Sequence, residues 1–286
     1  MDLRSEMRYT LPTGTKKTSR AVSARAAEGQ QPVRPAVRHT HPRTGRIVLI
    51  GSFSRGVSPF VRSVHSLLAE RMLADGFKVQ LSAGEEPKEL ERAEGLLITD
   101  PAWFTLEREE ELRGKKQGFA LLTMRQACPN AVFLDAAGAW MSFLLEAEQR
   151  KTKRVLLSGS NDEREMPSLL PPAPLLKSIP PEKRPVFQVL PEGAAPLPDE
   201  GSCLLTCDEQ VMFRFPAGES AEPEGRFWTA CMLPGCDIPS FRSRSFRADP
   251  EAVAREMQRI LYRQMKTGNT SDPGAILPVL WGAKKV

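Results

Sequence analysis

The sequence lacks any apolar run long enough to cross a bilayer. Its apolar blocks are short, such as residues 47–50 and 119–122, whereas a membrane-spanning helix takes about 18 consecutive apolar residues. Hydrophobic residues make up 41% of the 286 residues and charged residues 26%, which is ordinary for a chain that folds around a buried core. The composition therefore predicts a globular protein with no transmembrane segment.

Cysteine is also scarce. Its five copies are an odd number, and no apolar stretch typical of a secretory signal precedes them, so we expect reduced thiols rather than a disulfide framework. Cys203 with Cys207 and Cys231 with Cys236 form two closely spaced pairs, a spacing compatible with zinc in a metal-stabilised adaptor protein. The alternative, which we favour, is that these cysteines are buried apolar side chains on strands and bind no metal.

The motifs of the common enzyme classes are missing too. There is no Gly-x-Gly-x-x-Gly fingerprint, no Gly-x-Ser-x-Gly elbow and no His-Glu-x-x-His motif, and Val57 stands where a P-loop needs its lysine. Of the three histidines, His39 and His41 lie in a basic segment and His65 lies beside the apolar stripe of a predicted helix. The sequence therefore favours a protein without catalytic residues.

Positive charge is concentrated at the start of the chain. Residues 1–46 carry ten Lys or Arg against three acidic residues, a balance of +7, so the rest of the chain sums to −2 of the net +5. Residues 1–45 have little apolar periodicity, and we expect a basic extension that is disordered on its own and meets a polyanion such as RNA. A second basic patch at 242–247 alternates arginine with serine and phenylalanine, which suits phosphate contacts. The candidate nucleic-acid contacts are Lys16, Lys17, Arg20, Arg34, Arg38, Arg43, Arg242, Arg244 and Arg247.

Apolar blocks alternate with helical periodicity from residue 46 onward. The predicted strands are 47–50, 77–81, 95–100, 119–124, 131–134 and 155–157, and the predicted helices are 58–74, 106–116 and 138–151. The first helix begins at Ser58-Pro59, a good N-cap and first-turn pair, and ends at Asp75-Gly76. We therefore expect an α/β fold with a Rossmann- or flavodoxin-like, doubly wound, mostly parallel sheet over residues 46–160.

The second half of the chain divides into three further parts. Residues 161–200 are predicted to form a Pro-rich connector, because ten prolines exclude a continuous helix or a central strand. Residues 201–268 complete the core with strands and a C-terminal helix, which Asp249 opens and Gly268 ends. Residues 269–286 form a tail.

The loop after the first predicted strand carries the most informative motif. Its residues Gly51-Ser52-Phe53-Ser54-Arg55-Gly56-Val57-Ser58 stand before a helix N-terminus, where hydroxyl and N–H groups can bind phosphate oxygens. Alternatively, the serines merely cap the helix. Asp100, at the end of the third predicted strand, occupies the edge where open α/β sheets bind ligands.

This loop and the segment 92–104 resemble the corresponding parts of NADPH-dependent flavin reductases and other flavodoxin-like proteins. The resemblance implies an FMN site at the carboxyl edge of the sheet. Ser52, Ser54, Arg55 and Ser58 would face the phosphate, and Pro101, Ala102 and Trp103 would line the flavin ring. Gly56 and Asp100 are further candidate residues of this cofactor site.

Two classes of function follow from these features. We first expect a non-catalytic subunit of a large assembly, foremost the mitochondrial ribosome, because disordered extensions on a compact domain become buried interface in such particles. Its partners would be protein subunits and RNA, with no cofactor. Residues 18–27 have the Arg-, Ser- and Ala-rich composition of a transit peptide, which favours the mitochondrial matrix. The alternatives are a flavodoxin-like oxidoreductase with FMN, and a structural subunit of a respiratory complex or axonemal microtubule, in the cytoplasm or axoneme.

Overall fold

The computed structural model describes the chain from residue 45 to residue 282, with gaps. The described ranges are 45–51, 59–83, 90–100, 103–124, 127–158, 171–191, 199–206, 227–232 and 244–282. All of them belong to one compact unit, His41–Val286. None of the helices within these ranges combines the length and the apolar character needed to span a membrane.

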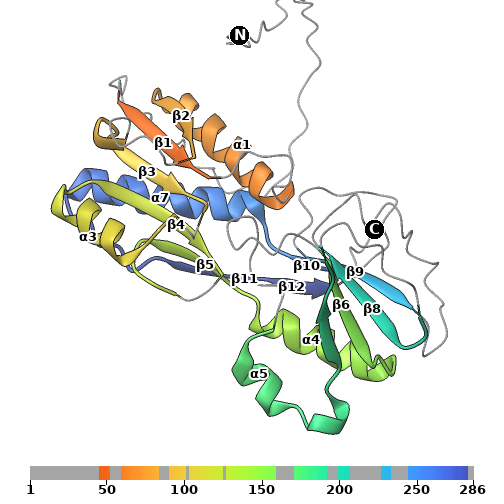
Figure 1. The fold of residues 1–286 in the computed structure, drawn as a ribbon. Helices are drawn as coiled ribbons and strands as arrows, with labels where there is room; N and C mark the ends of the chain where they lie inside the picture. Colours follow the sequence, from red (N-terminus) through yellow and green to blue (C-terminus); the bar gives the residue numbers. More distant parts are fainter. Residues whose placement is uncertain are drawn as a thin grey trace, which may run out of the picture. The chain divides into compact units, whose positions relative to one another are not determined.

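Six strands within the described ranges form the first sheet, and all of their described pairings are parallel (Figure 1). Their order across the sheet is β11-β5-β4-β3-β1-β2. The strands are β1 (Arg46–Ile50), β2 (Lys78–Ser82), β3 (Gly95–Ile98), β4 (Gly118–Thr123), β5 (Ala131–Asp135) and β11 (Ala275–Pro278). The strands predicted from apolar blocks in this region are thus confirmed.

Helices cover both faces of the first sheet. Alternate residues of β1 divide between two apolar clusters, with Ile47 and Leu49 in one and Val48 and Ile50 in the other, as the period of a strand requires. The first cluster includes side chains of α1 (Pro59–Ala74) and α7 (Pro250–Thr267), and the second includes Leu112 of α3 (Leu106–Gly114). The central strands are therefore buried on both sides.

The long helix α7 has the ends that the sequence predicts. Asp249 is its N-cap, and the side chain of Asp249 accepts a hydrogen bond from the backbone N–H of Glu251. Gly268 follows in the left-handed conformation with φ of 67°, and its N–H bonds the carbonyl oxygen of Gln264. The apolar stripe between these ends packs against α1 and β4.

A second sheet of six strands follows, in the order β12-β10-β9-β8-β6-β7. Its described pairings are parallel except for β10 with β12. The strands are β6 (Arg154–Ser158), β7 (Val186–Val189), β8 (Ser202–Thr206), β9 (Trp228–Met232), β10 (Arg244–Arg247) and β12 (Leu280–Gly282). Between β6 and β7 lie the short helices α5 (Ala173–Ser178) and η1 (Pro181–Lys183).

One face of the second sheet is closed by the helix α4 (Ala137–Gln149) and a group of aromatic rings. Phe143 of α4 lies 5.7 Å from the ring of Phe246 on β10 and 5.2 Å from that of Trp281 on β12. The indole N–H of Trp281 donates to Glu146 Oε2 at 3.1 Å. The aromatic contacts thereby attach the last strand of the sheet to α4.

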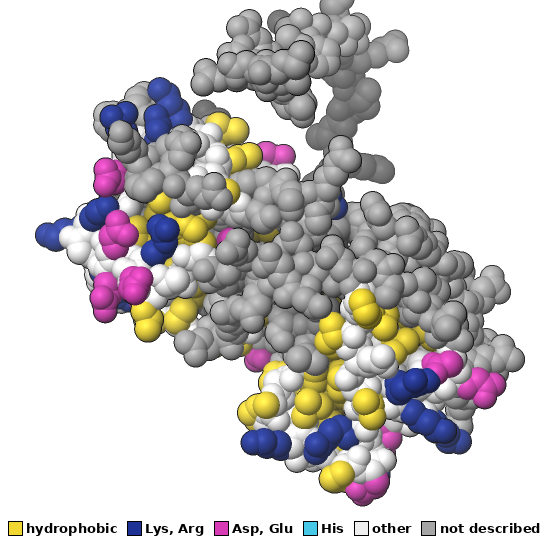
Figure 2. Space-filling model, viewed as in Figure 1, with side chains coloured by type: hydrophobic (Ala, Val, Ile, Leu, Met, Phe, Trp, Pro, Cys, Tyr) yellow, Lys and Arg dark blue, Asp and Glu magenta, His cyan; other side chains and the backbone are white. Residues whose placement is uncertain are grey.

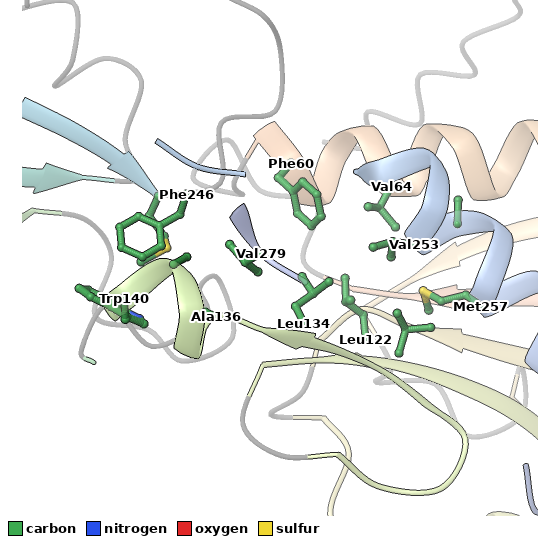
Figure 3. Packing of buried hydrophobic residues seen from close by; sticks show 14 of the residues in the cluster. Phe60, Val64, Leu122, Leu134, Ala136, Trp140, Phe246, Val253, Met257 and Val279 are labelled. Atoms are coloured by element: carbon green, nitrogen blue, oxygen red, sulfur yellow. The ribbon is translucent and has the colours of Figure 1, made fainter. Parts of the chain in front are cut away.

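The chain passes between the two sheets at three short crossovers. It leaves the first sheet after β5, returns after β10, and leaves again between β11 and β12. Ala136 and Val279 occupy two of these crossovers, and both belong to the apolar cluster that also contains Trp140 and Phe246 (Figure 3). The N–H of Val279 donates to the carbonyl oxygen of Asp135 at 2.8 Å, so these two crossovers are hydrogen-bonded to each other.

This topology corrects part of the predicted fold. The α/β class and the mostly parallel strands are confirmed, but a single doubly wound sheet was wrong, because β6 opens a second sheet and pairs with β7 and β8. An apolar block indicates a buried strand without indicating which neighbours it pairs with. Residues 269–286, named above as a tail, contain β11 and β12, one strand in each sheet.

The side-chain amide of Gln264 on α7 supplies a test of the first sheet. It is 3% exposed, accepts from the N–H of Phe119 at 3.0 Å and donates to the carbonyl oxygen of Phe119 at 2.7 Å. Gln264→Leu leaves both backbone groups buried without a partner, so we expect it to lower the unfolding free energy by about 2–4 kcal/mol. Urea denaturation measures this, with Gln149→Leu at an exposed position of α4 as the control. Equal stabilities of the two variants would contradict the assignment.

Candidate functional site

Buried polar side chains gather where the parallel strands end. Ser82, Thr99, Asp100 and Thr123 lie at or just after the ends of β2, β3 and β4, and each is at most 9% exposed. Because parallel strands point the same way, their carboxyl ends share one edge of the sheet, which is where open α/β sheets bind ligands. We therefore take this edge of the first sheet as the candidate site.

The second sheet repeats the pattern. Ser158 ends β6 and Thr206 ends β8, the two residues are paired in the strand register, and both are buried. Apolar residues stand directly before them, at positions 155–157 of β6 and 203–205 of β8. These two strands therefore change from apolar to hydroxyl-bearing residues at the carboxyl edge, as β3 and β4 do in the first sheet.

His65 of α1 and Thr99 form the innermost part of the site. The hydroxyl of Thr99 donates to the carbonyl oxygen of Ile50 at 3.2 Å and is hydrogen-bonded to Nε2 of His65. A hydroxyl has one proton, so Thr99 accepts the proton of Nε2. A Cβ at Gly51 would lie 2.5 Å from Thr99 Oγ1 and 2.8 Å from His65 Nε2. Only glycine therefore fits beside this pair without displacing it.

Asp100 and Trp103 form a turn just beyond β3. The N–H of Trp103 donates to Asp100 Oδ1 at 3.3 Å, and the guanidinium carbon of Arg108 on α3 lies 4.4 Å from the Trp103 ring centre. The cation on one face of the ring fixes the orientation of the indole. Asp135 ends β5, and its Oδ1 accepts from the N–H of Ala137, the first residue of α4, at 2.9 Å.

The structure describes part of the predicted site. Asp100 and Trp103 lie together at the carboxyl edge of the first sheet. The loop residues Ser52, Ser54, Arg55, Gly56 and Ser58, together with Pro101 and Ala102, lie outside the described residues. Their part in a site remains a prediction.

Most of the predicted nucleic-acid contacts also lie outside the described residues, namely Lys16, Lys17, Arg20, Arg34, Arg38, Arg43 and Arg242. Arg244 and Arg247 belong to β10, and the Nε of Arg247 donates to Ser245 Oγ at 2.7 Å. The predicted basic patch at 242–247 is therefore partly a strand of the second sheet.

The cysteine pairs are described only in part, because Cys207 and Cys236 lie outside the described residues. Cys203 belongs to the apolar cluster under α4, whereas Cys231 alternates with Ala230 and Met232 of that cluster and so faces the other side of the sheet. Burial, with a smaller contribution from Glu146, raises the pKa of the Cys203 thiol well above its ordinary value. These two thiols do not face a common ion, and no cluster of potential metal ligands occurs among the described residues.

Comparison with known proteins gives a fold and no family. No family model matches the sequence, and no curated protein matches it. Solved structures do resemble it. A LacI family transcriptional regulator from Arthrobacter, in complex with lactose, superposes with a TM-score of 0.57 at 11% identity, over 84% of this chain and 98% of its own. The fold is similar to that of LacI family regulators.

Two further structures have the same fold. A LacI family regulator from Enterococcus faecalis with bound ribose has a TM-score of 0.57 and 14% identity, over 83% of this chain and 96% of its own. An ABC sugar transporter subunit from Rhodobacter sphaeroides has a TM-score of 0.55 and 11% identity, over 84% of this chain and 98% of its own.

These comparisons overturn two predictions. The resemblance to flavin reductases was wrong, because the similar structures are LacI-type regulators and a transporter subunit rather than flavodoxin-like proteins. A short motif like that at 51–58 follows the first strand in many α/β folds, and it does not indicate how many sheets the rest of the chain forms. The prediction of a subunit of the mitochondrial ribosome was wrong for the same reason, since the similar proteins are sugar-bound regulators and a sugar transporter subunit.

Sequence reasoning missed most residues of the candidate site. Ser82, Thr123, Ser158 and Thr206 each form the last residue of a strand, and no motif marks them. For Thr123, Ser158 and Thr206 the available signal was a repeated one, a hydroxyl residue directly after a run of apolar residues, whereas Ser82 follows the alternating segment Lys78–Leu81. His65 was seen only as a residue beside an apolar helix stripe, because its bond to Thr99 spans 34 positions.

The burial of His65 predicts a pH dependence of stability. Burial lowers the pKa of His65 to about 4 from its ordinary 6.5. Between these values the unfolded chain binds a proton that the folded protein excludes, so acidification costs stability, in total roughly 3 kcal/mol by pH 4. His65→Gln removes this contribution.

Urea denaturation from pH 7 to pH 4 measures the effect. We expect the unfolding free energy of the parent protein to fall by more than that of His65→Gln, mainly below pH 6.5. Parallel curves for the two proteins would show that the His65 imidazole is protonated equally in the folded and unfolded states.

Proposed function

We propose that this protein binds a small polyhydroxylated molecule of the sugar class at the carboxyl edges of its parallel strands. One observation carries the proposal: hydroxyl-bearing or acidic residues are buried at the carboxyl ends of strands in both sheets, directly after buried apolar residues in β3, β4, β6 and β8. The LacI-type fold supports it, because similar structures hold lactose and ribose.

The chemistry of the edge suits such a ligand. Serine and threonine hydroxyls both donate and accept, as sugar hydroxyls do, and a carboxylate accepts from two neighbouring hydroxyl groups. Asp100 supplies the carboxylate and Trp103, half-buried beside it, supplies an aromatic face against which the C–H groups of a sugar ring can pack. A few placed polar groups in an apolar setting are typical of small-molecule sites.

Isothermal titration calorimetry of the full chain with ribose, lactose and cellobiose tests the proposal. We expect at least one of these sugars to bind and FMN to give no heat of binding. Asp100→Asn removes the charged acceptor, and its loss should weaken binding by roughly tenfold to a hundredfold, as for a hydrogen bond to a charged group. Trp103→Ala should weaken binding as well.

Glu110→Gln is the matched control. It makes the same change from carboxylate to amide at an exposed position of α3, and we expect it to bind like the parent protein. The proposal fails if none of the sugars binds at millimolar concentration, or if Asp100→Asn and Glu110→Gln bind equally well.

A further inference from the structure

The strand β7 is an edge of the second sheet and presents unused backbone groups outward. Among the strands that the structure describes, β7 pairs with β6 alone. The N–H of Val186 donates to the carbonyl oxygen of Lys153 and that of Leu190 to the carbonyl oxygen of Leu157, both at 2.9 Å. Since successive residues of a strand point their N–H and C=O groups to opposite sides, those of Phe187 and Val189 point away from the sheet.

Prolines limit this free edge to a short window. Pro185 and Pro191 stand two residues from Phe187 and Val189 respectively, at positions that would also point outward, and proline has no N–H to donate. The outward donors of this segment are therefore those of Phe187 and Val189. Prolines on an edge strand prevent it from pairing along its whole length, so any partner strand can pair only with the window between Pro185 and Pro191.

One side chain of β7 packs into the core, and two others form an exposed apolar surface. The ring of Phe187 lies 6.3 Å from that of Trp140 in the core, which anchors the strand from one side. Val186 is 62% exposed and Val189 46% exposed. Figure 2 shows hydrophobic side chains exposed on the face that carries α4 and α5, among basic and acidic ones.

We propose that β7 pairs antiparallel with β7 of a second copy of this chain, about a two-fold axis at Gln188. In this pairing Phe187 of each copy lies opposite Val189 of the other, and both exchange N–H and C=O groups, which makes four hydrogen bonds across the axis. Gln188 lies opposite Gln188 of the second copy, and Val186 lies opposite Leu190. The second sheet of one copy and the second sheet of the other then form one continuous sheet.

Charge favours a second copy in this direction. In the sequence, Glu182, Lys183 and Arg184 precede β7 and Glu192 follows it, and Lys183 is already ion-paired with Glu148 at 2.8 Å. Arg184 and Glu192 stand equally far from Gln188, so an antiparallel pairing about Gln188 places Arg184 of one copy opposite Glu192 of the other and brings unlike charges together. A two-fold interface needs such self-complementarity, since each copy contributes the same surface.

Charged substitutions at Gln188 test the pairing, because this exposed residue meets itself across the axis. Gln188→Lys and Gln188→Glu each place like charges opposite one another and should weaken dimerisation of the full chain by roughly fivefold or more. A mixture of the two variants pairs Lys with Glu, and we expect it to dimerise at least as well as the parent protein. Sedimentation velocity over a concentration series measures all three.

Gln149→Lys and Gln149→Glu, at the exposed end of α4, are the matched controls and should leave the dimer unchanged. Hydrogen exchange gives a second readout: the amides of Phe187 and Val189 should become protected as the protein concentration rises. The proposal is overturned if the parent protein remains a monomer at high concentration, if the Gln188 variants dimerise like the parent, or if mixing them restores nothing.

Discussion

The two-sheet arrangement depends on Ala136 and Val279, which lie at the crossovers and belong to one apolar cluster that contains residues of both sheets. Both are nearly buried, and each stands where the chain crosses between sheets. The bond from the N–H of Val279 to the carbonyl oxygen of Asp135 satisfies polar backbone groups that would otherwise lie unpaired inside this core. Asp135 and Val279, which are 144 positions apart in the sequence, are thereby fixed side by side.

The direction of the strands links this core to the candidate site. Parallel strands place all of their carboxyl ends at one edge, so a single rule, apolar residues followed by one polar residue, builds a polar edge in each sheet. Burying hydroxyl and carboxyl groups costs free energy unless they are hydrogen-bonded. In this protein hydrogen bonds offset that cost. The hydroxyl of Thr99 is bonded to the carbonyl oxygen of Ile50 and to His65, and the carboxylate of Asp100 accepts from the backbone N–H of Trp103.

Local patterns predicted much of the fold. The strands β1 to β6 and the helices α1, α3, α4 and α7 follow from apolar periodicity and from caps such as Asp249. The division into two sheets could not be predicted, because β6 has the same apolar character as β4 and only its distant partners differ. The strands β11 and β12 are short, and one contains Pro278, so their sequence alone resembles a tail.

The candidate site was less predictable than the fold. Asp100 and Trp103 could be found because they follow a strongly apolar strand and lie close in sequence. Ser158 and Thr206 come together only through the pairing of β6 with β8, and Thr123 reaches the edge of the first sheet only because β4 pairs in parallel with β3 and β5. A resemblance based on the loop at 51–58 and the segment 92–104 indicated the wrong family of proteins, because many α/β folds begin with a strand followed by such a loop.

The central claim is that the carboxyl edges of both sheets hold one ligand. Hydrogen–deuterium exchange read by mass spectrometry, with and without saturating ribose or lactose, tests it most directly. We predict slower exchange at the ends of β3 and β4 and also at the ends of β6 and β8, with the amino ends of these strands unchanged. Slower exchange in one sheet alone, or at the amino ends, would contradict the account.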